Sequence, residues 1–165
     1  MSVRFSDGMS PVWSLRQALR SDAPWIAELR ALVMRPDLER LGRWDPVRVR
    51  QRFRDGFLPA HTFVIEVECS PVGVIAVRPE RDEQWIEHFY LGSQHQGRGI
   101  GSEVLRHVMA TLGDARPFRL NVLQGSSAQR LYERHGFVHE HEDPIDVFLV
   151  ARTIAETGPA NPEAR

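Results

Sequence analysis

The sequence contains no lysine, a single cysteine and no long apolar run. All 21 basic residues are arginine, and the formal net charge is -1. This balance gives no reason to expect nucleic acid or an anionic membrane surface as the main partner. Cys69 stands alone, which excludes an internal disulfide and favours a reducing compartment. Because no stretch resembles an apolar leader or a bilayer-spanning segment, we expect a cytoplasmic protein with no membrane partner.

The length and composition indicate one ordinary globular domain. A chain of 165 residues can bury a full core but leaves little room for a second domain. The hydrophobic content of 42% and charged content of 26% are typical of a folded domain. The pattern predicts a flexible arm over residues 1–11, a folded domain over 12–151 and a polar tail over 152–165.

The first half of the chain is expected to contain a strand, two helices and a hairpin. Each helix start pairs a capping residue with a proline in the first turn, where a missing N–H is tolerated. In chain order we expect a strand over 12–16, a helix that starts at 21–24 and ends at Pro36, a second helix capped by Asp45, and a hairpin with strands 62–68 and 74–77 joined by a turn at 70–73.

Residues 85–112 organise the rest of the chain. Their aromatic and aliphatic beginning predicts a strand over 86–91, and apolar residues at helical spacing predict a helix over 100–112. Between them, glycines stand at 97, 99 and 101. A glycine loop leading into a helix start exposes unpaired N–H groups, which suit a phosphate. The dinucleotide fingerprint does not fit this spacing, and the P-loop motif requires a lysine.

The second half is expected to complete a mixed sheet. A strand over 118–123 should pair in parallel with 86–91, because a helix connects them. Ser126 and Gln129 have the spacing of a capping box for a helix beginning near Ser127, and Gly136 is placed to end it. Two final strands, separated by a break at 143–144, should pair antiparallel. This order indicates an α/β domain rather than a regular βαβαβ series.

Two motifs in this setting resemble those of the GNAT superfamily of N-acetyltransferases. Residues 96–101, Gln-Gly-Arg-Gly-Ile-Gly, match the Q/R-x-x-G-x-G/A acetyl-CoA motif. Residues 122–137 resemble V-x-x-x-N-x-x-A-x-x-L-Y-x-x-x-G-F, although Gly125 stands where many members have asparagine. The resemblance covers about residues 12–151. It implies a mixed, mostly antiparallel six- to seven-stranded sheet with a parallel pair at the cofactor cleft, flanked by about four helices.

The resemblance also implies a cofactor, acetyl-CoA, and the residues that hold it. The pantetheine arm would pair with the backbone of Phe89, Tyr90 and Leu91. Ser127 and Tyr132, from the second motif, complete the expected set, and Ser126 or Ser127 can cap the helix in place of the missing asparagine. The pyrophosphate would lie on the glycine loop and helix start, at Gln96, Gly97, Arg98, Gly99, Ile100, Gly101 and Ser102.

The same resemblance assigns two of the expected catalytic residues, and the strand pattern suggests the third. Tyr132 is the expected general acid, and the backbone N–H of Leu91 the expected oxyanion donor. Glu87 is the expected base, since alternation places it on the side of Phe89 and Leu91 if no bulge intervenes. His88 and an ordered water are the alternatives.

The implied function is direct transfer of an acetyl group from acetyl-CoA to an amine of a small molecule or peptide. Cys69 lies outside both motifs, which argues against a covalent acetyl-enzyme. A catalytically silent acetyl-CoA sensor, transfer of a longer acyl chain, and a homodimer all stay open. Arg35, Asp37 and Trp44 are candidates for the acceptor pocket by location. We expect no metal site, because the histidines at 135, 139 and 141 lack a recognised ligand pattern.

Overall fold

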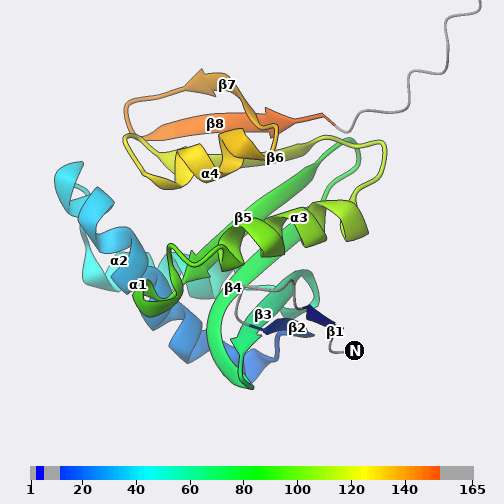
Figure 1. Cartoon of the computed structure of the whole chain (residues 1–165). Helices are drawn as coiled ribbons and strands as arrows, with labels where there is room; N and C mark the ends of the chain where they lie inside the picture. Colours follow the sequence, from blue (N-terminus) through cyan, green and yellow to red (C-terminus); the bar gives the residue numbers. More distant parts are fainter. Residues whose placement is uncertain (1–2, 6–11, 153–165) are drawn as a thin grey trace, which may run out of the picture.

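The computed structural model describes residues 3–5 and 12–152, whose strands form one sheet in the order β1-β2-β3-β4-β5-β6-β8-β7 (Figure 1). Its strands are β1 Val3–Phe5, β2 Trp13–Gln17, β3 Thr62–Val67, β4 Ser70–Pro79, β5 Gln84–Leu91, β6 Phe118–Leu123, β7 Val138–Glu142 and β8 Asp146–Ala151. Its helices are α1 Ala23–Arg40, α2 Pro46–Gly56, α3 Ile100–Leu112 and α4 Ala128–Arg134.

The predicted fold class is confirmed. Among the described strands, β5 and β6 form the one parallel pair, and all other neighbours are antiparallel. The eighth strand is β1, which pairs with β2 and lies inside the predicted arm over residues 1–11. The rest of that arm, and the predicted tail beyond Arg152, lie outside the described residues.

The two faces of the sheet carry different helices and different cores. On one face, α3 buries Ile100, Val104 and Leu105 completely, in a cluster that also holds Tyr132 of α4. Burying each such aliphatic side chain contributes about 2 kcal/mol, which stabilises the helix that the sequence pattern predicts. On the other face, Ile26 of α1 and Phe53 of α2 form a second cluster. We call these the α3 face and the α1 face.

The pairing of β5 with β6 is short. The two strands pair only at Gln84 with Phe118 and at Trp85 with Arg119, and we call these two residue pairs the β5–β6 seam. Beyond the seam, β5 continues to Leu91 and β6 to Leu123 without pairing to each other. The sheet therefore opens between its halves, and the backbone of the end of β5 is left without a β6 partner.

Three local predictions are wrong. Helix α1 continues through Pro36 to Arg40; the carbonyl that loses its partner belongs to Leu32, which is 71% exposed on the solvent side. The β3–β4 turn lies at Glu68–Cys69, both with positive φ, two residues before the predicted turn. The strands therefore pair closer to the turn, at Val67 with Ser70.

The third wrong prediction is the capping box before α4. The Ser126 hydroxyl accepts a hydrogen bond from the Ala128 N–H at 3.3 Å, but the Gln129 side chain donates to Glu133 instead of returning to Ser126. Gly136, with φ 85°, follows α4 as predicted.

A bulge in β5 has the largest effect on the site. Val74 of β4 pairs with Tyr90, and Ala76 with Glu87, so one residue of β4 faces two of β5. His88, at the bulge, has φ 49°. An extra residue reverses the alternation of side chains beyond it. As a result, Glu87 does not share a face with Phe89 and Leu91 as alternation alone predicts.

Candidate functional site

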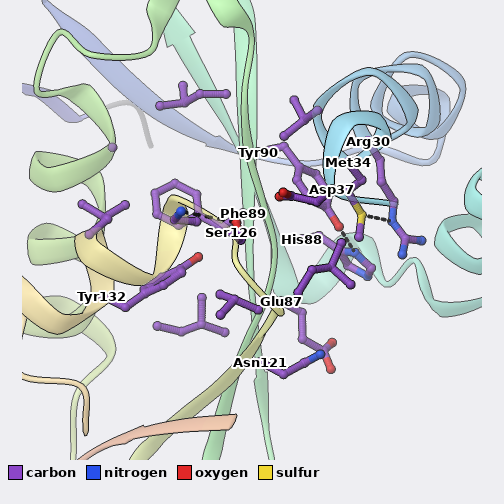
Figure 2. Close-up of a pocket in the computed structure, with 18 of the residues that line it drawn as sticks. Arg30, Met34, Asp37, Glu87, His88, Phe89, Tyr90, Asn121, Ser126 and Tyr132 are labelled. Atoms are coloured by element: carbon purple, nitrogen blue, oxygen red, sulfur yellow. Dashed lines mark hydrogen bonds between the residues drawn. The ribbon is translucent and has the colours of Figure 1, made fainter. Parts of the chain in front are cut away.

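A cavity of about 870 Å³ lies where the sheet opens beyond the β5–β6 seam (Figure 2). Residues from both faces line it. Phe89, Leu91 and Tyr132 come from the α3 face, and His88 and Tyr90 from the α1 face. The cavity therefore gives access from the glycine loop on one side of the sheet to helices α1 and α2 on the other.

The start of α3 forms the anion-binding end of this cavity. Gly97 has φ 70° and Gly99 has φ 84°, a conformation that costs glycine little and other residues more. Gly99 is the N-cap of α3, and no side chain caps the helix. The first-turn N–H groups thus lack the side-chain acceptor that usually satisfies one of them, and the helix dipole favours an anion there.

The structure places most of the expected cofactor residues on this cavity. Those that line it are Phe89, Tyr90, Leu91, Gln96, Gly97, Gly99, Gly101, Ser102, Ser127 and Tyr132. Arg98 and Ile100 do not line it: Arg98 is exposed to solvent, and the Ile100 side chain is fully buried in the core. A Cβ at Gly101 would make an ordinary contact with the Leu91 side chain at 3.4 Å, so the start of α3 lies directly beside the end of β5.

The backbone of Leu91 is directed away from β4. The Gly92 N–H donates to the Val72 carbonyl at 2.8 Å, which makes these two a hydrogen-bonded pair. The next pair, Gly73 with Leu91, is therefore of the non-hydrogen-bonded kind, in which both backbone groups point away from the partner strand. The Gln96 side-chain amide donates to the Leu91 carbonyl at 2.8 Å, as expected for a backbone group that points away from β4. The Leu91 N–H is consequently available on the open side of β5.

Tyr132 of α4 closes the α3 face of the cavity. Its side chain is 6% exposed and packs edge-to-face with Phe89, with 6.3 Å between ring centroids. Burial, with a smaller effect of Tyr90, raises the pKa of the Tyr132 hydroxyl above its ordinary value. The hydroxyl makes no hydrogen bond to any other described residue. It therefore stays protonated near neutral pH and has a proton to donate.

The β5 bulge brings Glu87 and His88 to the α1 face. The Glu87 carboxylate accepts from the Arg78 guanidinium at 3.0 Å and is about one third exposed. His88 packs edge-to-face with Phe53, and its Nδ1 lies 3.4 Å from the Tyr90 hydroxyl. Burial, and next the charge of Arg30, lowers the pKa of His88 to about 4. The imidazole is therefore neutral near pH 7.

The sequence reasoning missed the part of the cavity wall that belongs to α1. Arg30 and Met34 line it, and the Arg30 guanidinium donates to the Met34 sulfur at 3.1 Å and to the Val49 carbonyl at 3.0 Å. An arginine one turn after the buried Ile26 was the available signal, since it breaks the apolar face of the helix. Apolar spacing along this helix would also place Leu32 in the core, but Leu32 is 71% exposed.

Of the three residues expected in the acceptor pocket, Asp37 lines the cavity. Arg35 lies over the Trp44 ring, 5.3 Å from its centroid, and neither residue lines the cavity. Gly125, with φ 73°, packs against the Arg40 guanidinium, which donates to the Gln124 carbonyl. The glycine thus makes room for an arginine that joins the end of α1 to the loop after β6.

Outside the cavity, two further sequence features can be placed. Cys69 is exposed in the β3–β4 turn and does not line the cavity. His139 and Glu142 lie 3.2 Å apart on β7, and in residues 3–5 and 12–152 no group of three or more acidic, histidine or cysteine side chains is placed to hold a metal. None of the helices in the described part of the chain is both long and apolar enough to cross a membrane.

Comparison with known proteins agrees with this geometry. Residues 59–139, which hold the glycine loop, Leu91 and Tyr132, match the family model of the acetyltransferase (GNAT) domain. The chain contains a GNAT acetyltransferase domain. The resemblance stated from the two motifs is thereby confirmed. No curated protein matches the sequence significantly.

Solved structures share the GNAT fold. PH1933 from Pyrococcus horikoshii OT3 has a TM-score of 0.68 and 23% identity, over 86% of this chain and 98% of its own. The PaiA N-acetyltransferase from Thermoplasma acidophilum, in complex with coenzyme A, has a TM-score of 0.68 and 15% identity, over 86% and 99%. N-acetylglutamate synthase from Neisseria gonorrhoeae, complexed with coenzyme A and N-acetyl-glutamate, has a TM-score of 0.60 and 22% identity, over 85% and 35%. At these identities the likeness shows the fold.

Proposed function

We propose that this protein transfers an acetyl group from acetyl-CoA directly to a primary amine of a small molecule or peptide. One observation carries the proposal: the uncapped start of α3 opens into a cavity that passes the parted strands and reaches the other face of the sheet. Two similar proteins, the PaiA acetyltransferase and N-acetylglutamate synthase, are described in complex with coenzyme A. Their GNAT fold supports the same cofactor here.

The residues present fit acetyl-CoA at each part of the cavity. The diphosphate would be held by the N–H groups at the start of α3, next to Gly99 and Ser102. The pantetheine amides would pair with the end of β5, where the backbone lacks a β6 partner. When bound, acetyl-CoA supplies the thioester carbonyl and a thiolate leaving group.

The chain's own residues supply the remaining chemistry. The Leu91 N–H, directed away from β4, would donate to the oxygen of the acetyl group as negative charge develops there. The Tyr132 hydroxyl would donate its proton to the departing sulfur. The neutral phenol makes no competing hydrogen bond to another described residue, so no contact must be broken first.

The amine must lose a proton, and Glu87 is the residue we propose to accept it, directly or through a water molecule. The bulge places Glu87 on the α1 face, so an amine bound on that face would lie opposite the cofactor. His88 is the alternative base. Because its pKa is about 4, an His88-dependent rate would be lost only at strongly acidic pH. Replacing Glu87 with Gln and His88 with Asn, and measuring kcat/KM against pH for each, separates the two.

Two measurements test the function itself. Acetyl-CoA at a hundred times its dissociation constant should stabilise the fold by about 2.7 kcal/mol, visible as a rise in Tm. Release of free thiol in the presence of a panel of primary amines then measures transfer. Absence of any rise in Tm would overturn the proposal. A rise without thiol release for any amine would instead indicate an acetyl-CoA sensor without turnover.

The compartment and the assembly are part of the proposal. We propose a cytoplasmic location, where the single cysteine stays reduced and acetyl-CoA is available. Light scattering of the purified protein distinguishes a monomer from the homodimer that the resemblance leaves open.

A further inference from the structure

The α1 side of the cavity contains a positive charge that no carboxylate neutralises. The Arg30 guanidinium donates to two neutral acceptors, the Val49 carbonyl at 3.0 Å and the Met34 sulfur at 3.1 Å. Within residues 3–5 and 12–152, no acidic side chain forms an ion pair with it. Figure 2 shows Arg30 close to Met34 and His88, on the side of the cavity away from Tyr132.

The acidic residues that line the same cavity already have partners. Glu87 pairs with Arg78 at 3.0 Å, and Asp37 pairs with Arg40 at 2.9 Å. Asp146 accepts from the Asn121 amide at 2.8 Å. Asp55, which is exposed, accepts from the Gln51 amide at 2.7 Å. Of the other arginines that line the cavity, Arg78 is paired with Glu87, and Arg52 and Arg134 are exposed to solvent. Arg30 is the partly buried arginine of this cavity that has no charged partner among the described residues, and it is the one that an anionic ligand group held inside the cavity would meet on the α1 face.

The surroundings of Arg30 strengthen its attraction to an anionic group. Its stem lies on a helix next to Val33 and Met34, which also line the cavity. His88 beside it is neutral near pH 7, because burial, and next the charge of Arg30, lowers its pKa. Burial raises the pKa of the Tyr90 hydroxyl, and Arg30 offsets part of that rise. A guanidinium among apolar and neutral groups binds a carboxylate more strongly than one in water does, and its planar shape suits two hydrogen bonds.

We propose that the acceptor is an amine that also carries a carboxylate, an amino acid or a compound like it, whose carboxylate binds Arg30. This inference rests on the proposed acetyl transfer and specifies its substrate class. The amine of such an acceptor would lie toward the middle of the cavity, while the carboxylate is held on the α1 side. A polyamine would place a second positive charge against Arg30, where it is repelled, and is therefore a poor acceptor.

The test compares matched acceptors in the wild-type enzyme. Leucine and methionine are each paired with their amides and with the corresponding amines that lack the carboxylate, and thiol release is measured for all six. The amide of an amino acid is less basic than the acid, so more of it is unprotonated at a given pH. A preference for the acid therefore does not arise from amine ionisation. We expect kcat/KM to be roughly tenfold to a hundredfold higher for the acids than for their amides.

Variants of Arg30 assign the preference to that residue. Arg30→Met keeps a stem of similar length without the charge and should abolish the preference through KM, with kcat changed less. Arg30→Lys keeps the charge and should restore part of the preference. The matched control is Arg43→Met, at an exposed arginine that does not line the cavity, and it should leave the preference unchanged.

A binding measurement keeps the proposal testable if no amine is acetylated. The probes are N-acetyl-leucine and N-acetyl-leucinamide, titrated by calorimetry into the protein saturated with coenzyme A. Tighter binding of the carboxylate, lost in Arg30→Met, supports the anion site even where turnover fails and the proposed function falls. Equal binding of the two compounds overturns the inference, as does an amide preference in the rate assay or an acid preference that survives Arg30→Met.

Discussion

Replacing Tyr132 with Phe removes one hydroxyl from the centre of the cavity and leaves the ring. The ring packs edge-to-face against Phe89 at 6.3 Å and against Phe137 at 5.7 Å, contacts that phenylalanine retains. The hydroxyl makes no hydrogen bond to another described residue, so its loss leaves no buried partner unsatisfied. We therefore expect the free energy of unfolding to change by less than about 0.5 kcal/mol, or to rise slightly.

The catalytic effect should be far larger than the effect on stability. Removing a positioned general acid typically lowers the rate by roughly 10²- to 10⁴-fold, which corresponds to about 3–5 kcal/mol of barrier. The loss should fall on kcat, because the hydroxyl is needed when the sulfur departs rather than when the cofactor binds. The assay is thiol release at saturating substrates, together with calorimetry of acetyl-CoA binding and a thermal melt.

Tyr90→Phe is the matched control, because the chain has two tyrosines and both line the cavity. The Tyr90 hydroxyl lies on the α1 face, 3.4 Å from His88 Nδ1, and we expect its removal to lower kcat by less than tenfold. A kcat for Tyr132→Phe within about threefold of wild type would refute the role of Tyr132 as the acid. So would a loss of acetyl-CoA affinity equal to the loss of rate, since the hydroxyl would then act in binding.

Three further changes test the loop, the N-terminal ion pair and the bulge. Gly99→Val places a β-branched residue at φ 84° and should weaken acetyl-CoA binding, measured by calorimetry, at least tenfold. The control is Gly42→Val, which imposes a similar backbone strain of about 1–2 kcal/mol at a site without nearby atoms and should leave the affinity unchanged. Asp22→Asn should lower the free energy of unfolding by roughly 2–3 kcal/mol at pH 7, because Arg16 holds the pKa of that carboxyl well below its usual range. This stabilisation exists above pH ~4, so the difference between variant and wild type in denaturant melts should shrink below that pH, and a difference that stays constant would contradict the ion-pair argument. His88 has a folded pKa of about 4 against 6.5 in the unfolded chain, so the wild type should lose up to about 3 kcal/mol of its free energy of unfolding as the pH falls from 6.5 to 4. His88→Asn should lack this pH dependence, and its absence from the wild type as well would show that the imidazole is solvated.

The spacing of apolar residues, together with the positions of glycine, proline and capping residues, was enough to predict most elements of the fold. The helix over 100–112 and the strand over 118–123 have the predicted bounds. An apolar stripe at helical spacing indicates a helix, and an alternating apolar and polar run indicates a strand. The helix cap at Asp45 is also confirmed: its carboxylate accepts from the N–H groups of Val47 and Arg48. These features depend on residues close together in the sequence.

The features that sequence reasoning missed depend on residues far apart. The bulge at His88 reverses the facing of Glu87, and it is visible only when β5 is paired with β4. Pro36 continues a helix because the exposed side of α1 tolerates a free carbonyl, which propensity alone does not reveal. Arg30 joins the cavity because α1 packs across β5. The catalytic roles of Tyr132, Glu87 and Leu91 stay predictions.

The β5–β6 seam has a consequence for the protein without its cofactor. In the described part of the chain, the backbone pairing between β5 and β6, which leads on to β8 and β7, consists of two residue pairs. A bound pantetheine arm would therefore bridge two parts of one sheet. We expect amides at the end of β5 to exchange with deuterated water quickly in the empty protein and slowly once coenzyme A is present. Such a protein would be least resistant to proteases when the cell's coenzyme A pool is depleted.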